Sequence, residues 1–212
     1  MPRLVSISKN YKDKAIFDDF NLAIEDKKIT CILGESGAGK TTLANIILGL
    51  TDHQGGVEGI EKPVSAVFQQ DRLIPSLTVM QNINLVNKNA NESVLDDIGL
   101  SGAGNMYPNR LSAGMARRVA ILRGLLYPAK TLIMDEPFIN LDIAIKYSII
   151  DKIKQEQVKE PKTVIMITHD IKEAVTLADR IVLLKDSKIV YDNSNITAET
   201  ETEIFNLMRG MK

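Results

Sequence analysis

An apolar run, a glycine-rich turn and a helical pattern follow one another directly in residues 29–50. The run Ile29–Leu33 predicts a buried strand, because it is short, apolar and bounded by a glycine. Helical spacing of apolar residues then predicts a helix over Thr41–Leu50, carried by Leu43, Ile46, Ile47 and Leu50. A strand that passes through glycines straight into a helix favours an α/β fold with this turn at the edge of a sheet.

The turn itself matches the pattern G-x-x-x-x-G-K-[ST], in the strand–turn–helix context that the pattern requires. Its glycines let successive backbone N–H groups point inward, so that they form an anion-binding nest at the positive end of the following helix. Lys40 can then reach the β and γ phosphates of a nucleotide, and the Thr41 hydroxyl can bind Mg²⁺. A plain glycine-rich turn with a surface lysine is the alternative, which the flanking elements disfavour. The predicted nucleotide-binding residues of this turn are Gly34, Glu35, Ser36, Gly37, Ala38, Gly39, Lys40, Thr41 and Thr42.

Strand and helix patterns alternate along most of the chain, which predicts a parallel sheet with crossover helices. The first 33 residues are rich in strand patterns, residues 51–62 are glycine-rich and polar, and residues 76–110 form a small helical insert. We expect strands at Val64–Phe68, Thr131–Met134 and Thr163–Thr168, a hairpin of Ile181–Leu184 with Lys188–Tyr191, and helices at Val79–Val86, Glu92–Leu100, from about Ala113, Ile143–Glu156, Ile171–Leu177 and Glu199–Met208.

Length and composition agree with one α/β domain that does not bind nucleic acid. The 212 residues suit a single domain. The 26 basic and 27 acidic residues nearly cancel, so no overall positive charge would attract nucleic acid or anionic lipid. The single cysteine, Cys31, excludes a disulfide within the chain and fits a reducing, cytosolic setting. No signal-peptide pattern and no run of roughly 18 apolar residues is present, so a membrane, if involved, would be spanned by another chain.

Acidic and imidazole side chains follow two of the predicted strands. Asp135 and Glu136 come directly after Thr131–Met134, and His169 follows Thr163–Thr168. Carboxyl ends of parallel strands share one edge of a sheet, so these side chains are expected to face the phosphates. Asp135 could hold magnesium, Glu136 could polarise the attacking water, and His169 could sense the γ-phosphate. Taken singly, each would more often be an ordinary turn residue.

Together these motifs resemble those of ABC transporter nucleotide-binding subunits, from about Val5 to Tyr191. The stretch Arg110–Met115 resembles the signature sequence that separates this family from other P-loop proteins. It departs at Ala113, where glycine is usual, and at Met115, where glutamine is usual. The stretch Pro137–Asp142 resembles the loop that crosses the interface between two such subunits.

The resemblance also implies roles for single residues. Tyr11 would stack on adenine with Ile16 on the strand behind it, although a tyrosine packed on the core is the structural alternative. Gln69 would contact Mg²⁺ and water. Ser112 and the Gly114 amide would cap the γ-phosphate held by a second subunit, and Asp142 would help position that opposing site. The implied catalytic residues are Glu136, His169 and Gln69, and the implied metal ligands are Thr41, Gln69 and Asp135.

The family has a P-loop NTPase (RecA-like) parallel-sheet core, an N-terminal antiparallel β subdomain and a small α-helical subdomain. The resemblance thus implies a core of about 1–69 and 119–212, and a helical subdomain of about 70–118. It implies ATP and Mg²⁺ as ligands and a second ATP-binding subunit, permease subunits and an extracytoplasmic solute-binding protein as partners. It places the chain at the cytoplasmic face of the membrane.

Three stretches resemble bacterial importers of the nitrate, sulfonate, taurine or pyrimidine-precursor type: Phe68–Ile83, Glu136–Asp142 and Thr168–Ala174. An exporter ATPase and a soluble ABC-type ATPase of DNA repair or translation are alternatives. The soluble class usually carries a long coiled coil or a second cassette, which this length does not accommodate. A P-loop kinase or GTPase leaves the signature and Gln69 unexplained, and an inactive subunit is disfavoured because Glu136 and His169 are both present.

Overall fold

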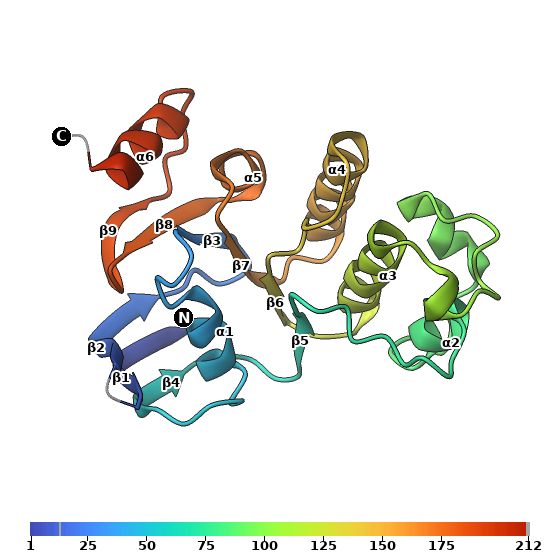
Figure 1. Ribbon diagram of the computed structural model, residues 1–212, viewed down its shortest axis with the longest axis horizontal. Coiled ribbons are helices and arrows are strands. Elements are labelled where there is room, and N and C mark those ends of the chain that lie inside the picture. Colours follow the sequence, from blue (N-terminus) through green and yellow to red (C-terminus); the bar gives the residue numbers. More distant parts are fainter. Residues whose placement is uncertain (13, 211–212) are drawn as a thin grey trace.

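A six-stranded sheet runs through the middle of the molecule in the computed structural model, which describes residues 1–12 and 14–210 (Figure 1). Its strand order is β5-β6-β7-β3-β8-β9, and every pair is parallel except β8 with β9. The parallel α/β core and the closing hairpin are therefore confirmed. The strands are β3 (Ile29–Gly34), β5 (Val64–Val67), β6 (Thr131–Asp135), β7 (Thr163–Thr168), β8 (Arg180–Lys185) and β9 (Lys188–Asn193).

Strand register brings the ends of β3, β6 and β7 to one edge of this sheet. Leu33 of β3 pairs with Thr168 of β7, and Asp135 of β6 pairs with Ile167 of β7. The residues that follow these strands therefore leave the sheet side by side. Those residues are the glycine-rich turn, Glu136 and His169.

A second, three-stranded antiparallel sheet has the order β2-β1-β4 and lies beside the first (Figure 1). It consists of β1 (Arg3–Tyr11), β2 (Lys14–Ala23) and β4 (Gln54–Glu58). This confirms the N-terminal antiparallel subdomain. Strand β4 lies in the polar, glycine-rich stretch for which the sequence predicted no strand. Its residues lack apolar alternation, and its place is set by antiparallel pairing with β1.

The helices agree with the sequence pattern in position and differ at some ends. Helix α1 ends at Ile47 rather than Leu50, because the chain turns at Gly49 with φ of 69°. The segment Glu92–Ile98 is a 3₁₀ helix rather than an α-helix. The helices are α1 (Lys40–Ile47), α2 (Val79–Asn84), η1 (Glu92–Ile98), η2 (Pro108–Arg110), α3 (Ala113–Leu126), α4 (Ile143–Lys159), α5 (Ile171–Leu177) and α6 (Thr200–Arg209).

Two hydrophobic cores lie on opposite faces of the six-stranded sheet, as the alternation along β3 requires. Cys31 and Leu33 belong to the core that includes residues of α3, α4 and α5, whereas Ile32 belongs to the core shared with α1 and the three-stranded sheet. The sheet is thus covered on both faces, which explains why β3, β6 and β7 are buried along their whole length.

Helices α2, η1 and η2 lie at the end of the molecule away from the three-stranded sheet (Figure 1). Helix α3 begins there at Ala113 and continues to Leu126, where it packs against β5. The expected boundary at residue 118 falls inside this helix, and the division of the chain into 1–69, 70–118 and 119–212 stays a prediction.

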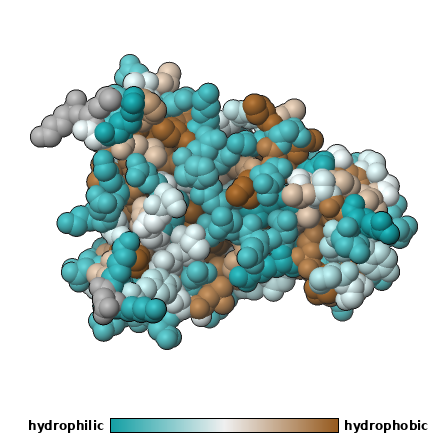
Figure 2. Space-filling view, in the orientation of Figure 1, coloured by the Kyte–Doolittle hydropathy of each residue, from teal (hydrophilic) through white to brown (hydrophobic). Residues whose placement is uncertain are grey.

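The face of the molecule in Figure 2 is largely hydrophilic or neutral, with apolar residues in scattered patches. Within residues 1–12 and 14–210, no helix combines the length and the apolar character needed to cross a membrane.

Candidate functional site

A cavity of about 670 Å³ opens at the edge of the sheet where β3, β6 and β7 end. Most of the predicted nucleotide-binding and catalytic residues line it, together with residues that the sequence did not single out: Lys14, Ile139 and Met208. The predicted residues in the lining are Tyr11, Ile16, Glu35, Ser36, Gly37, Gly39, Lys40, Thr41, Thr42, Gln69, Glu136 and His169. The structure therefore brings together side chains from distant parts of the chain.

The glycine-rich turn curls as an anion-binding nest requires. Gly37 and Gly39 have φ of 86° and 93°, a region that residues with a Cβ rarely adopt. Gly39 is also the N-cap residue of α1 and has no side chain that could cap the helix, so the first helical amides are presented to the cavity side. Gly34 and Ala38 are buried behind this surface.

The ammonium group of Lys40 is held in place by the turn itself. Its Nζ donates hydrogen bonds to the carbonyl oxygens of Gly34 at 2.7 Å and Glu35 at 2.9 Å. Burial lowers the pKa of Lys40, and the nearby carboxylates of Glu136 and Asp135 oppose that shift. A buried cation of this kind gains stability from an anion placed in the cavity.

Thr41 lines the cavity, and Asp135 is buried next to it without being part of the lining, so two hard oxygen ligands lie together there. The Thr41 hydroxyl donates to Oδ1 of Asp135 at 3.3 Å, and the Asp135 side chain is buried. Burial raises the pKa of Asp135, the hydrogen bond from Thr41 lowers it, and the charge of Glu136 raises it further. No group of three or more His, Cys, Asp or Glu side chains suited to a metal occurs in the described part of the chain. A few oxygen ligands fit Mg²⁺, which commonly takes one or two protein carboxylates and completes its shell with phosphate and water.

Glu136 and His169 meet across the ends of β6 and β7. The His169 Nδ1 atom lies 2.9 Å from Oε1 and 2.9 Å from Oε2 of Glu136. The Glu136 backbone has φ of 48°, and its N–H donates to the Ile167 carbonyl at 2.9 Å. This strained backbone turns the carboxylate toward the cavity, a placement suited to proton transfer from a bound water.

Tyr11 and Ile16 form the side of the cavity nearest the three-stranded sheet. Tyr11 is the last residue of β1 and is 46% exposed, so its ring is accessible to a planar ligand. Ile16 is half-buried on β2. The pair offers an aromatic face and an apolar wall, which is a suitable surface for a nucleotide base.

Ser112, Gly114 and Asp142 lie elsewhere, at the starts of α3 and α4. Ser112 Oγ accepts a hydrogen bond from the Met115 N–H at 3.2 Å, and Asp142 Oδ1 accepts one from the Ile145 N–H at 3.0 Å. A Cβ on Gly114 would lie 3.0 Å from the Asn140 carbonyl, so the two helix starts are close neighbours. These predicted residues are thus together, but outside the cavity that holds the others.

Four residues at or behind the site were not identified from the sequence. Lys14 lies two positions before Ile16 on β2, and the period of two along a strand could have indicated it. Ile139 lies in the loop after Glu136. Met208 comes from the C-terminal helix α6, which the sequence predicted, but no local signal places this residue at the cavity. Arg117 is almost completely buried on α3. It lies on the buried face of the helix, next in sequence to a second arginine, Arg118.

Comparison with known proteins identifies the family. The ABC transporter family matches residues 17–139. Aliphatic sulfonates import ATP-binding protein SsuB 1 of Rhodococcus jostii is 36% identical over 198 residues, covering 89% of this chain and 81% of that protein. Protein SsuB 2 of Pseudomonas syringae pv. tomato is 38% identical over 182 residues, covering 83% of this chain and 78% of that protein.

Solved structures agree with this assignment. A dimeric bacterial ABC transporter cassette has a TM-score of 0.81 at 28% identity, covering 91% of this chain and 98% of that chain. Its post-hydrolysis state bound to ADP and Pi has a TM-score of 0.79. The chain therefore belongs to the ABC transporter family, and it is an ATP-binding subunit that hydrolyses ATP.

Proposed function

We propose that this chain powers import of a small organic anion by forming a dimer in which each ATP is held between two subunits. The observation that carries the proposal is the separation of the predicted binding residues into two groups. One group lines the cavity, whereas Ser112 and Gly114 lie at the start of α3 outside it. A helix N-terminus with a serine is an anion-binding element, so it is well suited to the nucleotide of a second copy.

Within one subunit, the roles follow from the contacts. Lys40 exchanges its carbonyl partners for phosphate oxygens, since a charge-assisted bond to an anion is stronger than one to a neutral carbonyl. Glu136 accepts the proton of the attacking water, and His169 orients the Glu136 carboxylate through its hydrogen bond. Thr41, Asp135 and Gln69 would hold Mg²⁺, which supplies positive charge to the phosphates.

The test of a composite site is the dependence of ATPase activity on protein concentration. We expect the rate per subunit to rise with concentration, because only the dimer has complete sites, and Lys40→Ala to abolish the activity. A rate that is strictly proportional to protein concentration would contradict the dimer. Ser112→Ala provides a matched control, since it should lower activity without lowering ATP affinity of the monomer.

Import of an organic sulfonate is the transport function we propose, with permease subunits and an extracytoplasmic solute-binding protein as partners and the cytoplasmic membrane face as location. The similarity to sulfonate import proteins at 36% and 38% identity supports it. In the native host, deletion of this chain should stop growth on an alkanesulfonate as the sole sulfur source and leave growth on sulfate intact. Normal growth on the sulfonate would exclude this cargo, and uptake of labelled nitrate would then be measured.

A further inference from the structure

Arg117 lies on α3 between two segments of the nucleotide site that are far apart in the sequence. Its side chain is 1% exposed and is the largest of the fully buried side chains. A buried guanidinium is stable only when its N–H groups find acceptors, so its partners show what it holds. All of its partners belong to the loop after β5 or to the end of β6.

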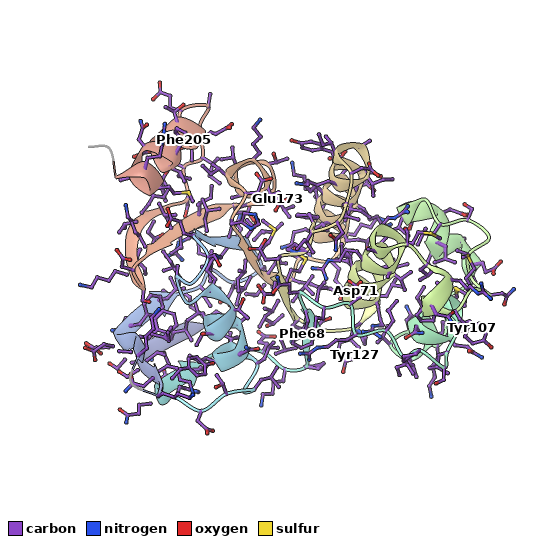
Figure 3. The ribbon with its side chains drawn as sticks, in the orientation of Figure 1. Phe68, Asp71, Tyr107, Tyr127, Glu173 and Phe205 are labelled. Atoms are coloured by element: carbon purple, nitrogen blue, oxygen red, sulfur yellow. The ribbon has the colours of Figure 1, made fainter. Side chains whose placement is uncertain are left out.

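The first set of contacts reaches the loop that carries Gln69. Nη1 of Arg117 donates to the Phe68 carbonyl at 2.5 Å and lies 3.4 Å from the Gln69 carbonyl. The same nitrogen pairs with Oδ1 of Asp71 at 3.2 Å. Figure 3 labels Phe68 and Asp71 just beyond the end of β5, in the direction of α3. Nη1 thus contacts two consecutive backbone carbonyls, those of Phe68 and Gln69, and the Asp71 carboxylate.

The second set of contacts reaches the residues at the end of β6. Nη2 donates to the Glu136 carbonyl at 2.6 Å and to the Asp135 carbonyl at 3.2 Å. Nε donates to the Pro137 carbonyl at 2.8 Å. Three consecutive carbonyls, including that of Glu136 in its strained conformation, are therefore held by the same guanidinium.

We propose that Arg117 is a positioning residue that fixes the Gln69 loop and the Glu136 backbone to each other, so that the two segments move as one unit. The inference rests on the roles proposed above for Gln69 and Glu136. A guanidinium is a rigid planar fork, so a displacement of the loop either carries the Glu136 backbone with it or leaves buried donors without acceptors. A lysine at this position has one point charge and cannot span both sets of carbonyls.

Arg123 supplies a matched control on the same helix. Its guanidinium donates to the carbonyls of Asp71 at 3.4 Å and Arg72 at 2.9 Å, and it lies 3.5 Å from Oδ1 of Asn82. Among the described residues it makes no hydrogen bond to the end of β6. Arg123 therefore holds the loop alone, whereas Arg117 holds the loop and β6 together.

The experiment compares Arg117→Lys with Arg123→Lys in the full chain. Amide hydrogen exchange is first measured without nucleotide, in peptides that cover residues 66–72 and 134–138. We expect Arg117→Lys to accelerate exchange in both segments and Arg123→Lys to accelerate it only in the first. Acceleration of only one segment by Arg117→Lys would overturn the proposal. This readout needs no hydrolysis, so its result is independent of the proposed roles of Gln69 and Glu136.

Steady-state kinetics provide the second readout. A misplaced carboxylate slows the chemical step, so Arg117→Lys should lower kcat by about 10- to 100-fold while KM for ATP changes by no more than about twofold. Arg123→Lys should lower kcat clearly less than Arg117→Lys, because it leaves the Glu136 backbone held by Arg117. Equal losses of kcat in the two variants would reduce Arg117 to a general packing role and overturn the proposal.

A milder variant covers the case in which Arg117→Lys does not fold. Asp71→Asn leaves the arginine in place and removes its ionic partner, which is 28% exposed. We expect exchange to rise in residues 66–72 and, through Arg117, in residues 134–138 as well. A rise confined to the first segment would show that the two segments move independently.

Discussion

The Nδ1 atom of His169 lies at the same distance, 2.9 Å, from both carboxylate oxygens of Glu136. The imidazole is 67% exposed, whereas the carboxylate is only 15% exposed. His169 is therefore the outer member of the pair, and it occupies one direction from which the carboxylate could accept a proton. We expect the two side chains to act as one unit.

A double-mutant cycle tests this relationship. Glu136→Gln removes the proton acceptor, and His169→Ala removes the group that orients it. Each should lower kcat by about 10²- to 10⁴-fold, the range for a general base. The double variant should be little worse than Glu136→Gln alone, because residues that act as a unit are not additive. Additive losses in single-turnover rates would show that His169 acts independently of Glu136.

Glu136→Gln should also trap the ATP-bound dimer. The amide keeps the shape of the side chain but cannot accept the proton, so bound ATP persists between two subunits. Size-exclusion chromatography with saturating ATP should show a dimer for this variant. Adding Lys40→Ala to it should restore the monomer. A monomeric Glu136→Gln chain would argue against the nucleotide-bridged dimer.

Tyr11→Ala should weaken ATP binding by about 1 to 3 kcal/mol, the usual loss when a stacked base loses its aromatic partner. Tyr11→Phe is the matched control, because it keeps the ring and removes only the hydroxyl. Binding is measured with a fluorescent ATP analogue or by calorimetry. If affinity is unchanged in the alanine variant, Tyr11 is a packing residue at the end of β1.

Gly39→Ala should destabilise the protein more than Gly37→Ala. Both glycines have positive φ, and an alanine there costs about 1 to 2 kcal/mol. A Cβ on Gly39 would also lie 2.7 Å from Cζ of Phe17, whereas a Cβ on Gly37 would have no neighbour within 4 Å. Overpacking should add about 1 to 3 kcal/mol for Gly39→Ala. Urea unfolding measures both variants, and equal losses would show that Phe17 moves aside freely.

Asp135→Asn should change how stability depends on pH. The folded pKa of Asp135 is raised above 3.8, mainly by burial. Between 3.8 and the folded pKa, the folded chain holds a proton that the unfolded chain has lost, so the free energy of unfolding falls as pH rises. Asparagine does not titrate, so the free energy of unfolding of the variant does not fall for this reason. The stability of the variant relative to the unmodified chain, without nucleotide or metal, should therefore increase as the pH rises above 3.8 and should level off above the folded pKa.

Urea unfolding of both chains at several pH values measures that difference. The other titratable groups are shared, so their contributions largely cancel in the comparison. A difference in unfolding free energy that stays constant across this range would show that Asp135 titrates normally in the folded chain.

The sequence determined the local chemistry of this protein. The turn around Lys40 is a continuous segment, so its glycines, lysine and threonine specify the nest without reference to the rest of the chain. The convergence of Glu136 and His169 was also predictable, because both follow apolar strands and parallel strands end at a common edge. The parallel core was predictable from the alternation of strand and helix patterns, whereas the N-terminal antiparallel sheet was implied by the family resemblance that the order of the motifs carries; both are confirmed.

Tertiary structure alone decided the features that depend on pairing and burial. Strand β4 has no strand-like pattern and exists because β1 offers it an edge. Met208 reaches the cavity because α6 packs against α5, with Ile204 buried in the core. Adjacent arginines on α3 look alike in the sequence, yet the packing of that helix turns Arg117 inward onto the backbone carbonyls of two loops. Contacts between distant segments carry no local signature, because their energy arises only when the whole fold brings donors and acceptors together.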